Sequence, residues 1–291
     1  METVKIIECP RDAMQGITSR FIPTERKIRY LNSLLKVGFD TIDFGSFVSP
    51  KAIPQMRDTA EVLQRLNLSD TRSKLLAIVA NLRGAEEACS FEEISYIGYP
   101  FSVSEIFQMR NTGKTIEESL VLLDQILDLA SKRNKEVVAY LSMGFGKSYG
   151  DPWNVDIISK WTRTLSGLGL KIISLSDTVG IADAKSIGYL FSEVIPKYPH
   201  IEFGAHLHTN PDLWYDKVNA AFSAGCRRFD GAIKGFGGCP MAKDDLTGNM
   251  PTEKLITYFA SRKVTTHINT LRFESAYNES LNIFEPQIQS G

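Results

Sequence analysis

The chain has 291 residues and a mass of 32.5 kDa, with 43% hydrophobic and 23% charged residues. These proportions are ordinary for a globular protein and exclude disordered, collagen-like and disulfide-scaffold classes. Lys and Arg total 33 against 34 Asp and Glu, so no basic excess directs the chain to nucleic acid. The longest apolar run, Leu75 to Ala80, is far shorter than the ~18 residues of a membrane span.

The N-terminal segment predicts no secretory signal, since its short apolar run is broken by Lys5. The four cysteines form no CxxC pair, which is typical of reduced thiols in the cytosol. We therefore expect a cytoplasmic protein that folds as a single domain over residues 1–291, with neither nucleic acid nor membrane as a partner.

Eight short runs rich in β-branched residues alternate with longer segments of helical periodicity. Several runs, such as KLLAIVA and KIISL, are almost continuously apolar, as are strands buried on both faces of a parallel sheet. The predicted strands are Val4–Cys9, Thr41–Phe47, Lys74–Ala80, Ile94–Tyr99, Glu136–Met143, Lys171–Ser176, Ile201–His208 and Arg227–Ile233. The predicted helices are Thr24–Val37, Pro54–Leu66, Arg83–Cys89, Thr115–Lys132, Asn154–Leu165, Ala182–Val194, Leu213–Ala224 and Thr252–Arg262.

Residues at the helix ends support this division. Thr24 is predicted as an N-cap and Gly38 as a C-cap, while Thr115 and Glu118 have the spacing of a capping box. The amphipathic segment Asn269–Phe284 predicts an additional C-terminal helix, after which Glu285 to Gly291 should fray. Eight alternations, with no Gly-rich phosphate loop after the first strand, favour a (β/α)8 TIM barrel over a doubly wound open sheet.

In such a barrel the chemistry lies at the C-terminal ends of the strands and in the loops that follow them. Ionisable and polar residues occupy most of these positions in the sequence. They are Glu8, Arg11, Asp12, Asp43, Ser46, Asn81, Ser176, Asp177, Thr178, His206, His208 and Asp230.

The sharpest local signal is AHLH, because alternate residues of a strand point to the same face. His206 and His208 could bind one metal together, with Asp12 as a carboxylate ligand, and this donor set suits Mn²⁺, Mg²⁺, Fe²⁺ or Zn²⁺. Alternatively, the two histidines are only hydrogen-bonded. Arg11 could stabilise a developing enolate, or it could form a structural salt bridge to Glu8 or Asp43.

GFGGCP is the second signal, with three glycines that allow close backbone approach. Cys239 at its end could act as an acid, a base or a nucleophile, or it could be an incidental thiol.

The order PRDAMQ, SFVSPKAIPQM, SDTVG, HLH, GFGGCP and TGN resembles the 3-hydroxy-3-methylglutaryl-CoA lyases, of the DRE-TIM metallolyase superfamily. The resemblance extends from Val4 to about Phe259, and Gly-Gly-Cys-Pro favours the lyases over the sister synthases, which usually have Gly-Glu-Arg. It implies a TIM barrel, a divalent metal (Mg²⁺ or Mn²⁺), an acyl-CoA substrate and a homodimer. The implied reaction is retro-Claisen cleavage to acetyl-CoA and acetoacetate, which places the family in leucine degradation and ketone-body metabolism.

The resemblance also assigns roles to residues of this chain. Asp12, His206, His208 and Asn249 would be metal ligands, Arg11 would stabilise the enolate, and Cys239 would transfer a proton. Asp43 stands where the family usually has Glu, and either it or His206 would be the base. The expected catalytic residues are Arg11, Asp12, Asp43, His206 and Cys239. The expected substrate contacts are Arg11, Gln15, Ser46, Asn81, Asp177 and Thr178.

The sequence departs from the family at several points. Cys9 and Ala13 flank PRD where the family has Gly, Thr209-Asn210-Pro211 follows HLH, and MGFGKSYGDPW replaces the usual fifth loop. Two alternatives to the lyase therefore stay open. One is a metal-dependent aldolase acting on a related hydroxyacyl-CoA or a hydroxy-keto acid, and the other is a catalytically silent barrel that binds a ligand.

Overall fold

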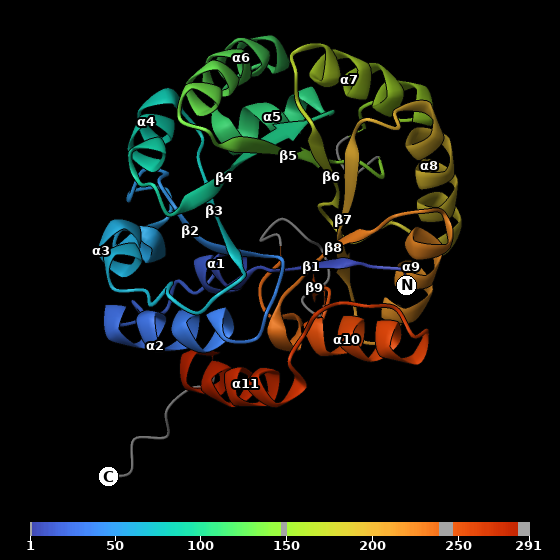
Figure 1. Ribbon diagram of the computed structural model, residues 1–291. Helices are drawn as coiled ribbons and strands as arrows, with labels where there is room; N and C mark the ends of the chain where they lie inside the picture. The colour runs from blue at the N-terminus through green and yellow to red at the C-terminus, as the bar shows by residue number, and fades with distance from the viewer. Residues whose placement is uncertain (1, 147–149, 239–246, 285–291) are drawn as a thin grey trace.

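The computed structural model describes residues 2–146, 150–238 and 247–284. Eight parallel strands form a closed barrel, in the order β1 to β8, with β8 paired to β1 and β7 to β6 (Figure 1). The strands are β1 (Lys5–Glu8), β2 (Thr41–Ser46), β3 (Lys74–Ile78), β4 (Ile94–Ser102), β5 (Glu136–Ser142), β6 (Ile172–Asp177), β7 (Glu202–Thr209) and β8 (Arg228–Gly231). This confirms the TIM barrel.

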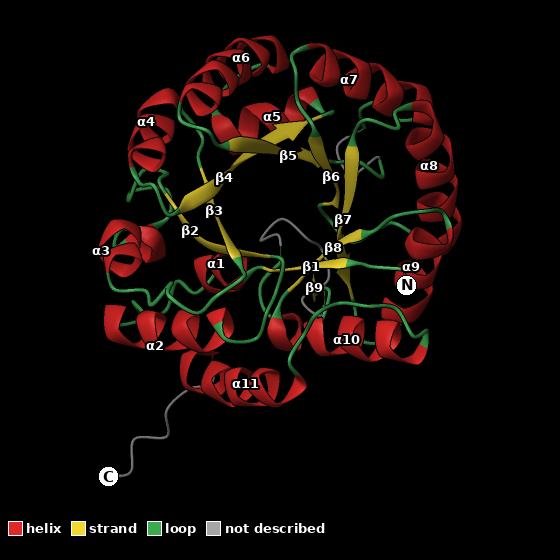
Figure 2. Ribbon diagram, in the orientation of Figure 1, coloured by secondary structure: helices red, strands yellow, loops and turns green. Residues whose placement is uncertain are grey.

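The helices form the outer ring around the barrel (Figure 2). One helix follows each strand: α2 (Thr24–Leu35), α3 (Thr59–Gln64), α4 (Leu82–Ser90), α6 (Ile116–Lys132), α7 (Val155–Gly167), α8 (Ala184–Lys197), α9 (Trp214–Ser223) and α10 (Thr252–Ser261). Further elements are α1 (Pro10–Gln15), α5 (Glu105–Thr112), α11 (Thr270–Phe284), the 3₁₀ turns η1 (Pro54–Met56) and η2 (Ile233–Gly235), and the short strand β9 (Gly248–Asn249). No helix of the described ranges is long and apolar enough to cross a membrane.

The predicted C-terminal helix is present as α11, which lies beside α2 on the outside of the barrel (Figure 1). Edge-to-face ring pairs join it to the rest of the chain, Phe284 to Tyr30 and Phe273 to Phe39. The predicted fraying of residues 285–291 lies outside the described residues.

Several predicted boundaries were wrong. Helix α2 has Pro23 as its N-cap, because the Thr24 hydroxyl donates instead to Asp58, 2.8 Å away. Its C-cap is Lys36, and Gly38 lies beyond it, where a Cβ would meet the His267 carbonyl oxygen at 2.8 Å. The capping box of Thr115 and Glu118 is confirmed.

Other elements differ in extent. The single helix expected over Pro54–Leu66 is divided into η1 and α3, and the third and eighth strands are shorter than predicted. The fourth strand extends to Ser102. Helices α1 and α5 were not predicted.

The barrel interior is apolar on one side and polar on the other. Six inward side chains of β3 to β6 form a compact apolar cluster: Leu76, Ile78, Tyr96, Val138, Tyr140 and Ile172. Their outward neighbours pack against the helices in the main core. Arg228, Asp230 and His206 occupy the opposite side on β7 and β8, so the charged groups are gathered where the first and last strands meet.

Glu8 links the two ends of the chain. Its carboxylate accepts hydrogen bonds from the Thr252 hydroxyl at 2.6 Å and from the Ile233 amide at 2.9 Å. Burial raises the pKa of Glu8 from 4.5 to about 8, against the lowering effect of these two donors. The folded chain therefore binds more protons than the unfolded chain between pH 4.5 and 8, and its stability falls as the pH rises through that interval.

Replacing Glu8 with Gln is expected to remove this part of the pH dependence, because an amide does not ionise. Urea unfolding from pH 5 to pH 8 should show a free energy of unfolding that falls with pH in the wild type and much less in Glu8→Gln. The exposed Glu86→Gln serves as the control and should follow the wild type. Parallel curves for wild type and Glu8→Gln would contradict the shifted pKa.

Candidate active site

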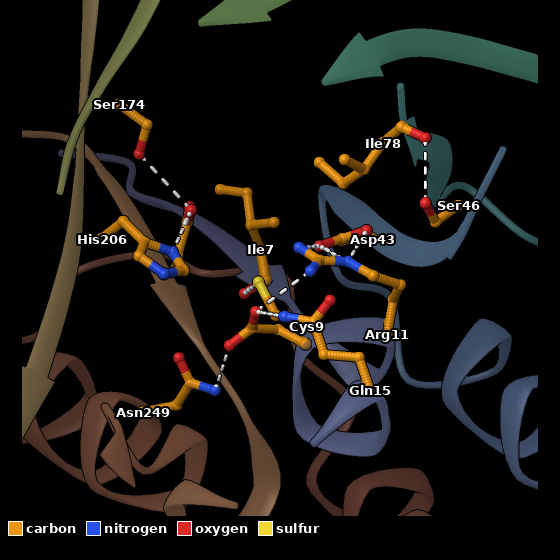
Figure 3. A network of polar contacts seen from close by, with 12 residues as sticks. Ile7, Cys9, Arg11, Gln15, Asp43, Ser46, Ile78, Ser174, His206 and Asn249 are labelled. Atoms are coloured by element: carbon orange, nitrogen blue, oxygen red, sulfur yellow. Dashed lines mark hydrogen bonds and ion pairs between the residues drawn. The ribbon is translucent and has the colours of Figure 1, made fainter. Parts of the chain in front are cut away.

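The site lies at the carboxyl ends of the strands, where β1 runs directly into α1. Pro10 occupies the first turn of this six-residue helix, and Arg11 and Asp12 follow it, both buried. Figure 3 shows Arg11, Asp43, Cys9, His206 and Asn249 gathered around one centre. Residues far apart in the sequence therefore meet at the barrel mouth, as expected for a TIM barrel.

Arg11 is held by two carboxylates. Its Nη2 and Nε lie 2.5 and 3.0 Å from Oδ2 of Asp43, and its Nη1 lies 3.0 Å from Oδ1 of Asp12. This two-point contact with Asp43 fixes the plane of the guanidinium. Burial raises the pKa of Asp43 to about 6, although Arg11 acts to lower it. The salt bridge to Asp43 considered from the sequence is present, whereas Glu8 bonds elsewhere.

Asp12 links Arg11 to Asn249. Besides Arg11, Gln15 Nε2 donates to its Oδ1 at 2.7 Å and Asn249 Nδ2 donates to its Oδ2 at 2.7 Å. Burial alone would raise the pKa of Asp12, but the charges of Arg11 and of the two histidines lower it to about 2. Asp12 is therefore an anion at neutral pH.

Both histidines of β7 have one ring nitrogen fixed. His206 Nδ1 lies 3.0 Å from Asp230 Oδ2, and His208 Nδ1 lies 3.0 Å from the carbonyl oxygen of Thr178. Since these oxygens accept, Nδ1 carries the proton in the neutral ring and Nε2 keeps a free lone pair. Burial lowers the pKa of His208 to about 4, so that its ring is neutral at physiological pH.

The donor set fits a divalent metal. One possible ligand atom each from Asp12, His206 and His208 lies within 4.8 Å of the others. His208 Nε2 is buried and has no hydrogen-bond partner within the described ranges. A bound cation would be the partner that this nitrogen lacks. Strand β9 pairs Asn249 with His208, so the fourth expected ligand stands beside the triad.

Gly237 explains why the glycine-rich loop can come so close to α1. Its φ is +85°, and a Cβ at this position would lie 2.7 Å from the carbonyl oxygen of Asp12 and 2.9 Å from Asn249 Nδ2. Only glycine leaves room for this contact. The following Cys239 lies outside the described residues, as do 240–246.

Besides Arg11 and Gln15, the other four expected substrate contacts also have polar partners within the protein. Ser46 Oγ donates to the Ile78 carbonyl, Asn81 caps α4 through the Gly84 amide, and Thr178 Oγ1 accepts from the Met143 amide. Asp177 is paired with Lys217. These bonds give each residue a role in holding the rim, and their contact with substrate stays a prediction.

Two residues that support the site were given no role from the sequence. Asp230 was placed among the polar residues at the strand ends, and on the inner face of β8 it fixes His206. Lys217 is on helix α9, where its charge gave no sign of burial. Its Nζ lies 2.8 Å from Asp177 Oδ2 and 2.7 Å from the carbonyl oxygen of His208, and thus joins β6 to the end of β7 that carries the two histidines.

Removing the Lys217 charge is expected to destabilise the fold strongly. Lys217→Met leaves Asp177 as an uncompensated charge with 1% of its side chain exposed, which typically costs about 3–5 kcal/mol. A urea titration should show a lower unfolding midpoint, and the double variant Lys217→Met/Asp177→Asn should recover part of the loss. A midpoint equal to that of the wild type would show that the pair contributes little.

Comparison with known proteins gives a consistent result. The HMGL-like family model matches residues 4–279. The zebrafish cytoplasmic 3-hydroxy-3-methylglutaryl-CoA lyase is 31% identical over 277 residues, covering 94% of this chain and 81% of that protein. The hydroxymethylglutaryl-CoA lyase of Bacillus subtilis is 30% identical over 275 residues, covering 92% and 88%.

Solved structures agree. The HMG-CoA lyase of Brucella melitensis has a TM-score of 0.91 at 28% identity, covering 98% of this chain and all of that one. An Acinetobacter baumannii HMG-CoA lyase in complex with coenzyme A and 3-methylmalate has a TM-score of 0.87 at 27% identity, covering 97% and 91%. With the family model matched over nearly the whole barrel, this chain belongs to the HMGL-like family.

Proposed function

We propose that this protein is a carbon–carbon lyase that cleaves 3-hydroxy-3-methylglutaryl-CoA to acetyl-CoA and acetoacetate. The observation that carries the proposal is the fixed Arg11 guanidinium beside the triad of Asp12, His206 and His208 at the mouth of the barrel. A fixed guanidinium next to three potential metal ligands suits a reaction in which negative charge develops on an oxygen. The names of the family relatives support the substrate.

The proposed cofactor is one divalent ion, Mg²⁺ or Mn²⁺. Asp12 and the Nε2 atoms of His206 and His208 would hold it, together with the carboxamide oxygen of Asn249, whose Nδ2 donates to Asp12 and to the Phe236 carbonyl. Once bound, such an ion lowers the pKa of a substrate hydroxyl and polarises a neighbouring carbonyl.

The chain's own residues would then move the protons. We favour Asp43 as the base, because a metal ligand whose Nδ1 is bonded to Asp230 has no nitrogen left to accept a proton. A carboxylate keeps lone pairs beyond those that Arg11 uses. The hydroxyl proton passes to Asp43, the bond between C2 and C3 breaks, and acetoacetate leaves with a carbonyl in place of the hydroxyl.

The electrons of the broken bond form the enolate of acetyl-CoA. In this proposal Arg11 stabilises the enolate oxygen, and Asp43 and Asp12 keep the guanidinium in place for it. Cys239 then donates a proton to the enolate carbon, which gives acetyl-CoA. As the resemblance implies, Gln15, Ser46, Asn81, Asp177 and Thr178 are the proposed further substrate contacts.

The assembly and location of the protein are proposed on the family resemblance. We propose a homodimer, as the resemblance implies, and a cytoplasmic location, as the name of the zebrafish relative suggests, although a bovine relative is named mitochondrial. The acyl-CoA partner is supported by the Acinetobacter structure, which is described as a complex with coenzyme A.

The test is release of products by metal-reconstituted protein. Purified protein is treated with EDTA, reloaded with Mg²⁺ or Mn²⁺, and supplied with 3-hydroxy-3-methylglutaryl-CoA. We expect acetyl-CoA and acetoacetate in equal amounts, and neither product before the metal is restored. Bound metal without products would discard this substrate in favour of a related hydroxyacyl-CoA or hydroxy-keto acid. If neither products nor bound metal were found, the remaining hypothesis would be the catalytically silent barrel that binds a ligand.

A further inference from the structure

A second group of potential metal ligands lies on the inner side of His206. One possible ligand atom each from Cys9, His206 and Asp230 lies within 4.8 Å of the others. Cys9 directly follows β1 and is the N-cap residue of α1, and Figure 3 shows its sulfur in the middle of the network, between His206 and Arg11. Cys9 follows the end of β1, His206 lies on β7 and Asp230 lies on β8, and these three strands are neighbours in the sheet.

The Asp230 carboxylate is incompletely paired. Its Oδ2 is bonded to His206 and, at 3.4 Å, to the Ser174 hydroxyl, but its Oδ1 has no partner within the described residues. Asp230 is only 3% exposed, so solvent does not satisfy this oxygen. A buried, unpaired carboxylate oxygen is costly, and a cation is the partner that compensates it best.

Cys9 is similarly short of partners. Among the described residues its sulfur donates only one long contact, 3.9 Å to the carbonyl oxygen of Ile7 two residues earlier. The contrast is Cys226, equally buried, whose sulfur lies 3.2 Å from the Arg228 carbonyl oxygen. The Cys9 thiol is therefore free to turn toward a ligand.

We propose that Cys9, His206 and Asp230 form a second, inner metal site that takes a thiophilic divalent cation such as Zn²⁺. Sulfur, nitrogen and oxygen donors together are characteristic of zinc rather than of Mg²⁺, which prefers oxygen alone. A thiolate and a carboxylate carry two negative charges, so they neutralise the ion in the interior. The site does not depend on the proposed lyase reaction, since it rests on these three side chains.

The two sites share His206, and they therefore compete. For the ion to bind Nδ1, the proton there moves to Nε2, and Nε2 can then no longer serve the outer site. The Cys9 thiol releases one proton to solvent as the sulfur–metal bond forms. The inner site is thus inhibitory: its ion displaces the ion that the proposed function needs, and this competition alone rests on the proposed outer metal.

Cadmium is the probe that tests the site, because a Cd–thiolate bond gives an ultraviolet charge-transfer band that Cd²⁺ on nitrogen and oxygen ligands lacks. We titrate the metal-free protein with Cd²⁺ and record this band together with the protons released. The wild type should develop the band with about one proton per ion, and Cys9→Ser should lose it. The matched control is Cys226→Ser, which removes an equally buried thiol outside the cluster and should keep the band.

A second measurement tests the competition. Protein loaded with Mn²⁺ is titrated with Cd²⁺ while bound Mn²⁺ is followed by its magnetic resonance signal. Half-displacement should need roughly 10- to 100-fold less Cd²⁺ in the wild type than in Cys9→Ser, where only the outer site remains. If Cys9→Ser is unstable, Cys9→Gly is used in its place, since glycine is the residue usual in the family at this position.

Each outcome decides the proposal. A band that persists in Cys9→Ser would place the cadmium on another thiol and overturn the inner site. A band that depends on Cys9 while Mn²⁺ stays bound would overturn the competition. Failure of the lyase assay alone would leave the cadmium band unchanged, so the two proposals fail separately.

Discussion

Replacing Arg11 with glutamine is expected to lower kcat by about 10²–10³-fold, the usual effect of removing one fixed donor from a developing oxyanion. Metal affinity should change little, because Arg11 touches the metal-competent triad only through Asp12. Steady-state kinetics with 3-hydroxy-3-methylglutaryl-CoA, together with Mn²⁺ titration, would measure both quantities on the same preparation.

Stability has to be checked alongside, since Arg11→Gln leaves Asp43 buried without its partner. The double variant Arg11→Gln/Asp43→Asn removes both charges, and a melting curve close to that of the wild type would show that it folds. As a control, Arg57→Gln removes a guanidinium that stacks on Phe21 instead of bonding these carboxylates. Near-wild-type kcat in Arg11→Gln would rule out the enolate role.

Truncating His208 to alanine is expected to abolish tight metal binding. An outer partner of a metal ligand is typically worth 10–100-fold in affinity, so the loss of a ligand should exceed ~100-fold. The free and buried Nε2 of His208 is the reason to choose this residue. Isothermal titration with Mn²⁺ would give the affinity, and product release should fall in parallel.

His200 provides the matched control, because this exposed histidine is bonded to the Ser166 hydroxyl far from the barrel mouth. His200→Ala should bind Mn²⁺ as the wild type does. If His208→Ala retained the wild-type affinity, the triad would not be the metal site, and the histidines would have only their hydrogen bonds to explain them.

The sequence predicted best those features that depend on local periodicity. Apolar runs located all eight strands, and the parity of β7 brought His206 and His208 to one face. Helix α1 was missed because six residues beginning with proline hold too few turns for a periodic pattern. The PRD motif was still recognised from the sequence, but its helical conformation was not predicted.

Long-range pairing decided the remaining differences. Asp58 accepts from Thr24 and pairs with Lys27, and these contacts take the Thr24 hydroxyl from its expected cap and fix the turn between η1 and α3. The partner of Asp177 could not be predicted for the same reason, since Lys217 lies on a helix 40 residues away in the sequence. Such pairs join segments whose proximity only the folded barrel creates, and no local pattern contains them.

The closure of β1 on β8 also has a consequence for how the chain is made. Lys5 pairs with Arg228, so the first strand has no neighbour on that side until more than two-thirds of the chain has left the ribosome. Asp12 is synthesised early, whereas His206, His208 and Asn249 arrive late. At the usual ~5–20 residues per second, the nascent chain spends many seconds as an open sheet without a metal centre. Binding of the proposed ion is therefore expected to follow synthesis of the last strands.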